Sequence, residues 1–304
     1  MAGTIGVNAY AALFQGNLDK LIIAEATSTF LEANPNQIQY NGGKTIKIAD
    51  ILVSGLKDYD RAKGFEGTEG TVTLSWTDYE LTQDRAVTFM IDAMDVDESA
   101  NMATAATVVA EFGRTQAVPE IDAYRWATIA KNTNVGHVAG VAADLTDADK
   151  FVALWDKAIV YFQELGMSLS DIALVTTPTQ LDLATNSKKF NSLKNTTSIS
   201  KGGVDYTVDA YRDIPLIPVP TARFRDTFTK VAAGGYDASA GKAIPFILMA
   251  KTGAATAITK TDKVRIFDPA TNQKADAYKI DVRIYHDIII PKNGAKAIVV
   301  PTIS

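Results

Sequence analysis

Hydrophobic and polar residues alternate along several long segments of the chain, and this period of two predicts β-strands. The segments run over 44–51, 71–76, 85–92, 262–268 and 278–290. They predict two long ribbons, the first within 44–92 and the second within 262–290. Because an isolated ribbon is marginally stable in water, each ribbon is expected to lie on another surface.

The connection inside the first ribbon, residues 58–70, is unusual. Its letters DYDRAKGFEGTEG contain six charged residues and three glycines, whereas hairpin strands are usually joined by about two to five residues. The strand that follows places Val72, Leu74 and Trp76 on one face and small hydroxyl residues on the other. A ribbon with a polar tip cannot bury both of its faces within one subunit, so a partner surface is expected.

A period of 3.6 residues predicts helices in other parts of the chain. A long, kinked helix pair is predicted over 96–132, with acidic residues at its start and Pro119 near the first turn of its second half. One further helix is predicted to start at Thr146 or Asp147, and another to span 178–193. Short apolar runs between these helices predict buried strands and therefore an α/β region.

The composition restricts the class of protein. The 304 residues carry a formal net charge of −5, which argues against a surface that embraces nucleic acid, because such binding needs many Lys and Arg residues. The chain has no cysteine, which excludes disulfides and thiolate metal sites. It has no signal-peptide pattern and no run apolar enough for a membrane span, so a cytosol-like compartment is expected.

The sequence contains no set of residues that predicts catalysis. The three glycines of 58–70 do not form a dinucleotide fingerprint, and the spacing of this segment does not fit a calcium loop. His286 is followed by Asp287, a pair that could orient a general base, but no nucleophile motif accompanies it. The simpler interpretation of His286 is a hydrogen-bonded strand residue at a sheet edge.

Two charged clusters are interpreted as surface features. The acidic group comprises Asp92, Asp95, Asp97 and Glu98, and it suits a helix start better than a metal site. The basic stretch 187–203 is interpreted as a solvated helix end and loop, with nucleic-acid contact as the alternative. No metal ion or cofactor is expected.

The order of these parts resembles the major capsid (coat) protein of tailed bacteriophages, which has the Hong Kong 97-type capsid fold shared with encapsulins and herpesvirus capsids. Local segments such as VTLSWTDYELTQDRAVTFMIDAMDVDES and KADAYKIDVRIYHDIII carry the same resemblance, which covers residues 40–300. It implies an α+β fold of five regions. These are an N-terminal arm (1–43), an extended ribbon called the E-loop (44–92), the spine helix of a P-domain (93–135), an α/β A-domain (136–258), and the P-domain ribbon with its loop and the C-terminus (259–304).

The resemblance also implies a structural, non-enzymatic function. Many copies would assemble through pentamers and hexamers into an icosahedral or prolate head shell, made in the bacterial cytoplasm, that encloses double-stranded DNA without sequence-specific contact. A portal and optional decoration proteins are implied partners, and a separate scaffolding protein is expected because the strand pattern begins by residue 44. The expected contact residues between subunits are Arg61, Lys63, Phe65, Glu66 and Glu69 in the E-loop, and Asn272, Gln273 and Lys274 in the P-domain loop.

Other functions remain open at this point. An encapsulin-type nanocompartment would use the same fold to hold a cargo enzyme. An α/β hydrolytic enzyme would use His286 and Asp287. Some family members cross-link their subunits through a lysine and an asparagine, and Lys63 could take this role, although nothing local identifies its partner.

Overall fold

The computed structural model describes residues 26–32, 45–59, 61–62, 64–65, 69–92, 94, 105–201, 204–272 and 274–303. The chain divides into two compact units. Unit 1 comprises Met1–Glu32 and Gln83–Ser304, and unit 2 comprises Ala33–Thr82. Unit 2 is therefore one excursion of the chain that leaves unit 1 after Glu32 and returns to it at Gln83.

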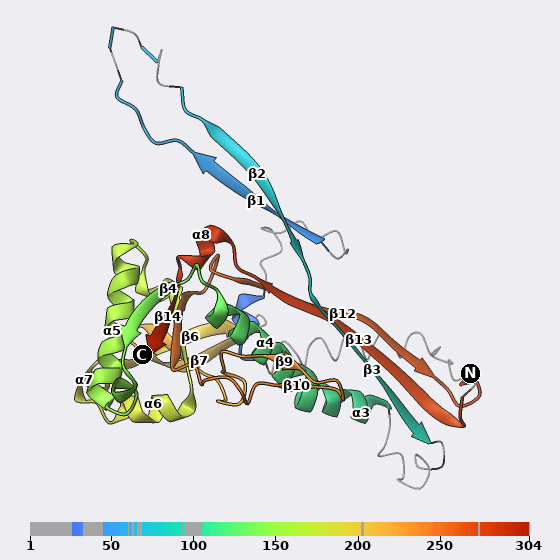
Figure 1. Ribbon diagram of the computed structural model, residues 1–304. Coiled ribbons are helices and arrows are strands. Elements are labelled where there is room, and N and C mark those ends of the chain that lie inside the picture. The colour runs from blue at the N-terminus through green and yellow to red at the C-terminus, as the bar shows by residue number, and fades with distance from the viewer. Residues whose placement is uncertain are drawn as a thin grey trace. The chain divides into compact units, whose positions relative to one another are not determined.

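Among the described residues, unit 2 contains two strands, and the remaining helices and strands belong to unit 1 (Figure 1). The strands of unit 2 are β1 (Thr45–Val53) and β2 (Val72–Glu80). The helices of unit 1 are η1 (Thr29–Leu31), α3 (Ala105–Phe112), η3 (Gly113–Ala117), α4 (Val118–Lys131), η4 (Ala142–Leu145), α5 (Ala148–Glu164), η5 (Leu169–Asp171), α6 (Pro178–Thr185), α7 (Lys188–Leu193) and α8 (Lys292–Ala295). Its strands are β3 (Gln83–Asp92), β4 (Gly136–Gly140), β5 (Ile172–Thr176), β6 (Lys194–Lys201), β7 (Val204–Tyr211), β8 (Ile214–Pro218), β9 (Thr229–Lys230), β10 (Tyr236–Asp237), β11 (Phe246–Ala250), β12 (Thr256–Phe267), β13 (Ala277–Ile289) and β14 (Ile298–Ile303).

A seven-stranded mixed sheet forms the α/β part of unit 1, in the order β4-β14-β11-β5-β8-β7-β6. Alternate residues of its central strands enter two different cores. Phe246 packs on the side of α5 with Trp155, whereas Ile247 packs on the other side with Trp126 of α4. Burial on both faces explains why β5 and β11 are continuous apolar runs in the sequence.

A three-stranded antiparallel sheet, β12-β13-β3, forms the second part of unit 1. The segment 85–92 was expected in the first ribbon, and this expectation is wrong, because β3 pairs with β13 and not with β2. The register shows the reason, since Val87 lies opposite Val282 and Phe89 lies opposite Ile280. These apolar pairs pack on the helices α3 and α4, and this burial determines which strand β3 joins.

The helices begin and end where local chemistry requires. The carboxylate of Asp147 caps α5 by accepting hydrogen bonds from two backbone N–H groups. The predicted helix over 178–193 is instead two helices, because the buried hydroxyl of Ser187 accepts a bond from the N–H of Phe190 and starts α7 anew. The long helix from α3 to α4 contains a π-helical turn, η3, just before Pro119, whose missing N–H interrupts the helical ladder.

Candidate functional site

The ribbon of unit 2 has a regular antiparallel register. Val53 pairs with Val72 at one end, and Lys47 pairs with Asp78 two pairs before the other end, where their side chains form an ion pair of 3.7 Å. Side chains on one face of a strand recur at every second residue, so Val72, Leu74, Trp76 and Asp78 share a face. The predicted face assignment of the segment 71–76 agrees with this register.

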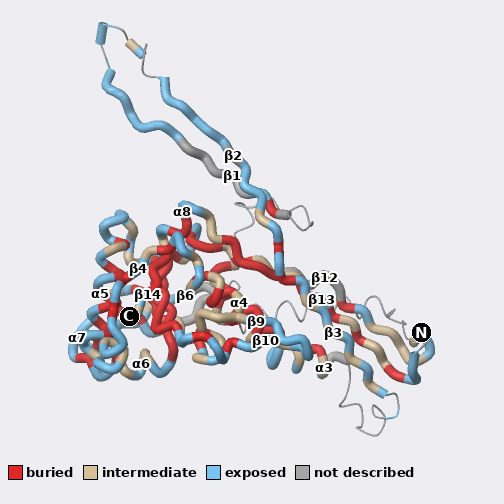
Figure 2. Tube along the Cα trace, in the orientation of Figure 1, coloured by how far each residue is buried: buried red, intermediate tan, exposed pale blue. Residues whose placement is uncertain are grey.

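An apolar strip of large side chains lies exposed on that face. The exposed fractions are 64% for Val53, 71% for Val72, 55% for Leu74 and 48% for Trp76, and these four residues are called the apolar strip below. In Figure 2, unit 2 is coloured exposed over most of its described length. Single exposed apolar residues are ordinary, but a contiguous row of them marks an interaction surface.

The loop beyond the apolar strip is held by hydrogen bonds at its base. The backbone N–H of Ser54 donates to the carbonyl of Thr71 at 3.0 Å, and the N–H of Thr71 donates to the hydroxyl of Ser54 at the same distance. The ammonium of Lys57 donates to the carbonyl of Glu69 at 2.9 Å. These bonds continue the ribbon past its last strand pair. The loop tip, which carries Tyr59 and Phe65, therefore lies well beyond the strip along the chain.

The predicted E-loop contacts Arg61, Phe65 and Glu69 are all exposed at this tip, whereas Lys63 and Glu66 lie outside the described residues. Phe65 is 81% exposed and packs edge-to-face on Tyr59, with ring centroids 5.2 Å apart. An aromatic pair that stays exposed has most of its apolar area still available for burial in a partner. The strip itself was visible in the sequence as Val72, Leu74 and Trp76, but Val53 was missed.

The predicted contacts of the β12–β13 turn have a different environment. Asn272 donates its side-chain amide to the carbonyl of Ala277 at 2.8 Å and accepts a bond from the N–H of Lys274 at 3.2 Å. Its side chain therefore shapes the turn. Lys274 is exposed, and Gln273 lies outside the described residues.

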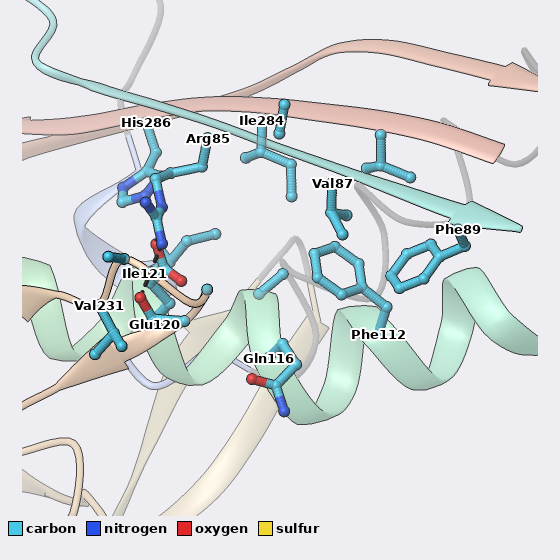
Figure 3. Close-up of a pocket in the computed structure, with 16 residues that line it drawn as sticks. Arg85, Val87, Phe89, Phe112, Gln116, Glu120, Ile121, Val231, Ile284 and His286 are labelled. Atoms are coloured by element: carbon cyan, nitrogen blue, oxygen red, sulfur yellow. Dashed lines mark hydrogen bonds and ion pairs between the residues drawn. The ribbon is translucent and has the colours of Figure 1, made fainter.

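Unit 1 contains a cavity of about 380 Å³ (Figure 3). It lies between β3, β13, the helices α3 to α4 and the β9–β10 loop. Its walls are mainly apolar, with the ion pair of Arg85 and Glu120 and the ring of His286 at one end. None of the described residues that line it is a serine, threonine or cysteine, so the lining offers no hydroxyl or thiol nucleophile.

His286 is not the sheet-edge residue that the sequence suggested. It lies on β13, the central strand of its sheet, and its side chain is 1% exposed. Burial lowers the pKa of His286 to about 3, and the positive charges of Arg125, Lys230 and Arg85 act in the same direction. A general base works best with a pKa near the working pH, so this environment does not support hydrolysis by His286 and Asp287.

The described part of the chain shows neither a metal site nor a membrane-spanning helix. No group of three or more His, Asp or Glu side chains there could hold a metal ion. Asp95, Asp97 and Glu98 of the acidic group lie outside the described residues. No helix among the described residues is long and apolar enough to cross a membrane.

Comparison with solved structures identifies the fold. The capsid structure of the cyanophage P-SCSP1u matches with a TM-score of 0.59 and 11% identity, covering 88% of this chain and 85% of that chain. The mature capsid of bacteriophage PhiM1 matches with a TM-score of 0.54 and 12% identity, covering 87% and 83%. A virus-like particle from Pyrococcus furiosus matches with a TM-score of 0.51 and 11% identity, covering 96% and 99%.

Comparison at the level of sequence finds no match. No protein-family model matches the chain, and no curated protein matches it. At identities this low the structural likeness shows the fold. The chain has the mixed α+β, Hong Kong 97-type fold of the capsid proteins of tailed phages, as the order of its parts predicted.

Proposed function

We propose that the protein is the structural coat subunit of a tailed bacteriophage, and that many copies assemble into the closed head shell around double-stranded DNA. The observation that carries this proposal is the exposed apolar strip on unit 2, found in a chain with a capsid fold. In this assembly the strip and the Tyr59–Phe65 pair at the tip lie on another copy of the chain.

The physical reason for a partner is the hydrophobic effect. A two-stranded ribbon has two open faces and no core of its own, and the strip leaves four large side chains about half or more exposed. Covering them with a second copy removes apolar area from water, which favours association. A contact between two different surfaces of identical subunits repeats around a ring or closed shell instead of ending at a dimer.

Electron microscopy of the purified protein tests the proposal directly. Free subunits are incubated over a range of protein concentrations and salt, alone and with a scaffolding protein from the same genome. Closed shells of uniform size are the expected result. Dispersed subunits under all conditions, with and without the scaffold, would contradict the proposal.

A nanocompartment shell is the second candidate function, because the virus-like particle from Pyrococcus furiosus matches over 96% of this chain and 99% of its own. The contents of the particle distinguish the two. A phage head holds DNA that nuclease cannot reach from outside, whereas a nanocompartment holds a protein cargo. Nuclease-treated particles from infected or induced cells are therefore analysed for both.

The remaining partners follow from the head-shell proposal. A scaffolding protein and a portal would act during assembly, and decoration proteins would bind the finished shell. The five regions from the N-terminal arm to the C-terminus would keep their expected order, with the E-loop ending at Thr82 because β3 belongs to unit 1. The negative net charge of −5 supports weak contact with the enclosed DNA, because a wall that bound phosphates tightly would need an excess of positive charge. Weak, salt-insensitive DNA binding by free subunits is the expected measurement.

A further inference from the structure

The two points where unit 2 leaves and re-enters unit 1 are held by charged residues of one helix, α4. Glu32 is the last residue before unit 2, and Gln83 is the first residue after it. These two ends, 26–32 and 83–92, are called the roots of unit 2 below. Both belong to unit 1, and each is fastened to α4 by side-chain hydrogen bonds.

The first root is fixed by a buried polar network. Asp122 of α4 accepts hydrogen bonds from the backbone N–H and hydroxyl groups of Thr27 and Ser28, at 2.7 to 3.2 Å. Arg125, one turn further along α4, donates to the hydroxyl of Ser28 at 2.8 Å and to the carboxylate of Glu32 at 3.0 Å. Asp122, Arg125 and Ser28 are all fully buried.

The network also reaches neighbouring parts of unit 1. Arg125 donates to the hydroxyl of Thr259 on β12, and that hydroxyl donates to Glu32 at 3.1 Å. Arg223 lies 3.6 Å from the carboxylate of Asp122. The backbone at Glu32 forms a parallel bridge with Ala257. The first root is therefore tied to α4 and β12 together.

The second root is fastened to the same helix through an ion pair. The guanidinium of Arg85 on β3 donates to the carboxylate of Glu120 on α4 at 2.6 Å and to the carbonyl of Gly235 at 2.8 Å. Figure 3 shows Arg85 and Glu120 pointing toward one another across the end of the cavity. Asp84 of the same root forms a bidentate ion pair with Arg283 of β13, in which the guanidinium nitrogens donate to the two carboxylate oxygens at 2.8 and 2.6 Å.

We infer that Glu120, Asp122 and Arg125 form a clamp on α4 that fixes both roots of unit 2 relative to one another before assembly. The three residues lie within five positions of each other, which is about 7.5 Å along a helix axis. This inference deepens the proposed function and rests on it, because the clamp would act by fixing, within unit 1, the two points at which the chain leaves for unit 2 and returns from it. Glu120, Asp122 and Arg125 are positioning residues and need not touch the neighbouring copy.

The charged groups of the clamp are a poor way to gain stability alone, which favours a role in positioning the roots. Burying charged groups requires desolvation, and replacing a buried ion cluster with apolar side chains of similar volume often leaves stability unchanged or higher. Apolar packing, however, tolerates small sliding movements, whereas hydrogen-bonded charges accept only a narrow geometry. A charged cluster that meets both ends of one excursion therefore favours a role in positioning.

Hydrogen–deuterium exchange of free subunits tests whether the clamp holds the roots. Asp122→Asn is expected to speed exchange of the peptide 26–32 at least tenfold, and Arg85→Gln that of the peptide 83–92. Exchange of α5 is expected to stay as in the wild type in both. The matched control is Asp209→Asn, which breaks the exposed ion pair of Asp209 with Lys194 and should change none of these rates.

The assembly assay then tests positioning. Arg85→Gln and the double variant Arg85→Gln/Glu120→Gln should each raise the protein concentration for half-maximal assembly about tenfold, and the double variant should be no worse than the single one because the two residues act as a pair. If Asp122→Asn fails to fold, Arg85→Gln still tests the clamp. The side chain of Arg85 is only partly buried, so the subunit should tolerate its replacement.

The outcomes separate the clamp from the proposed function. Unchanged exchange at both roots would overturn the clamp, and so would faster exchange with normal assembly, because the network would then be structural only. Wild-type subunits that never assemble would overturn the proposed function. The exchange rates, measured on free subunits, would still show in that case whether the clamp holds the roots.

Discussion

Replacing two residues of the apolar strip should weaken assembly without weakening the subunit. The double variant Leu74→Thr/Trp76→Thr keeps side chains that suit a strand and resembles the opposite face, which already carries Thr73 and Thr77. Leu74 and Trp76 are 55% and 48% exposed in the subunit, so about half of each side chain remains to be buried in a contact.

The size of the effect follows from those exposed fractions. Fully burying a large apolar side chain contributes about 1.5–3 kcal/mol, so burying the remaining half contributes roughly 1 kcal/mol for each residue. The double variant should then lose about 2 kcal/mol at each contact. Since about 1.4 kcal/mol is a factor of ten in an equilibrium constant, the association constant of one contact should fall roughly 30-fold.

Light scattering at a series of protein concentrations measures this loss as a higher concentration for half-maximal assembly. The melting temperature of free subunits should stay unchanged, because neither side chain contributes to a core. The control is Val160→Thr on α5, an apolar residue of unit 1 that is also 48% exposed. Half-maximal assembly within threefold of the wild type, with shells seen by electron microscopy, would refute the assignment of the strip as a contact surface.

Three further results are expected. Burial holds the pKa of His286 at about 3 in the folded chain, against about 6.5 in the unfolded chain. The contribution of neutral His286 to stability is therefore complete above pH 6.5, and stability falls by roughly 1.4 kcal/mol per pH unit as the pH is lowered toward 3. Chemical denaturation at several pH values should show a smaller slope in His286→Gln and an unchanged slope in His137→Gln. Gly294→Ala should destabilise the subunit by about 1–3 kcal/mol, because the added methyl group would meet two backbone carbonyl oxygens of the β11–β12 connection; an unchanged thermal melt would show that the chain relaxes there. Reversing Arg61 and Glu69 together should shift half-maximal assembly less than the strip variant does, because exposed ion pairs contribute only about 0–1 kcal/mol; a larger shift would move the main contact to the charged tip.

The fold was largely predictable from the sequence because its signals are local. The alternation over 44–51 and 71–76 predicted β1 and β2. The start of α5 was predicted at Thr146 or Asp147, and the hydrogen bonds of Asp147 to nearby backbone N–H groups show that it is the cap. The capsid fold was implied by a resemblance to phage coat proteins, which the order of ribbon, long helix, α/β region and second ribbon carried together with local segments of the sequence. The strand alternation and the helix cap depend on residues that are neighbours in the chain, and the sequence displays such neighbours directly.

The candidate contact surface was predictable in part. The charged tip of 58–70 belongs to the ribbon that carries the apolar strip, and Phe65 is as exposed as expected. The main apolar surface is nevertheless the strip, because Val53 joins Val72, Leu74 and Trp76 only once the register of β1 and β2 is known. A strand pattern gives the faces of one strand, and the pairing of two strands decides which faces coincide.

Only the tertiary structure decided the remaining features, and the physical reason is the same in each case. The sequence gives β3 a strand pattern but not a partner, and the choice of β13 depends on which apolar faces can be buried together against α3 and α4. Asp122 and Ser28 are separated by 94 positions and look like ordinary polar residues of a helix and an arm. Their cooperation in a buried network exists because folding removes both from water at the same place, and a buried polar group must then find its partner there.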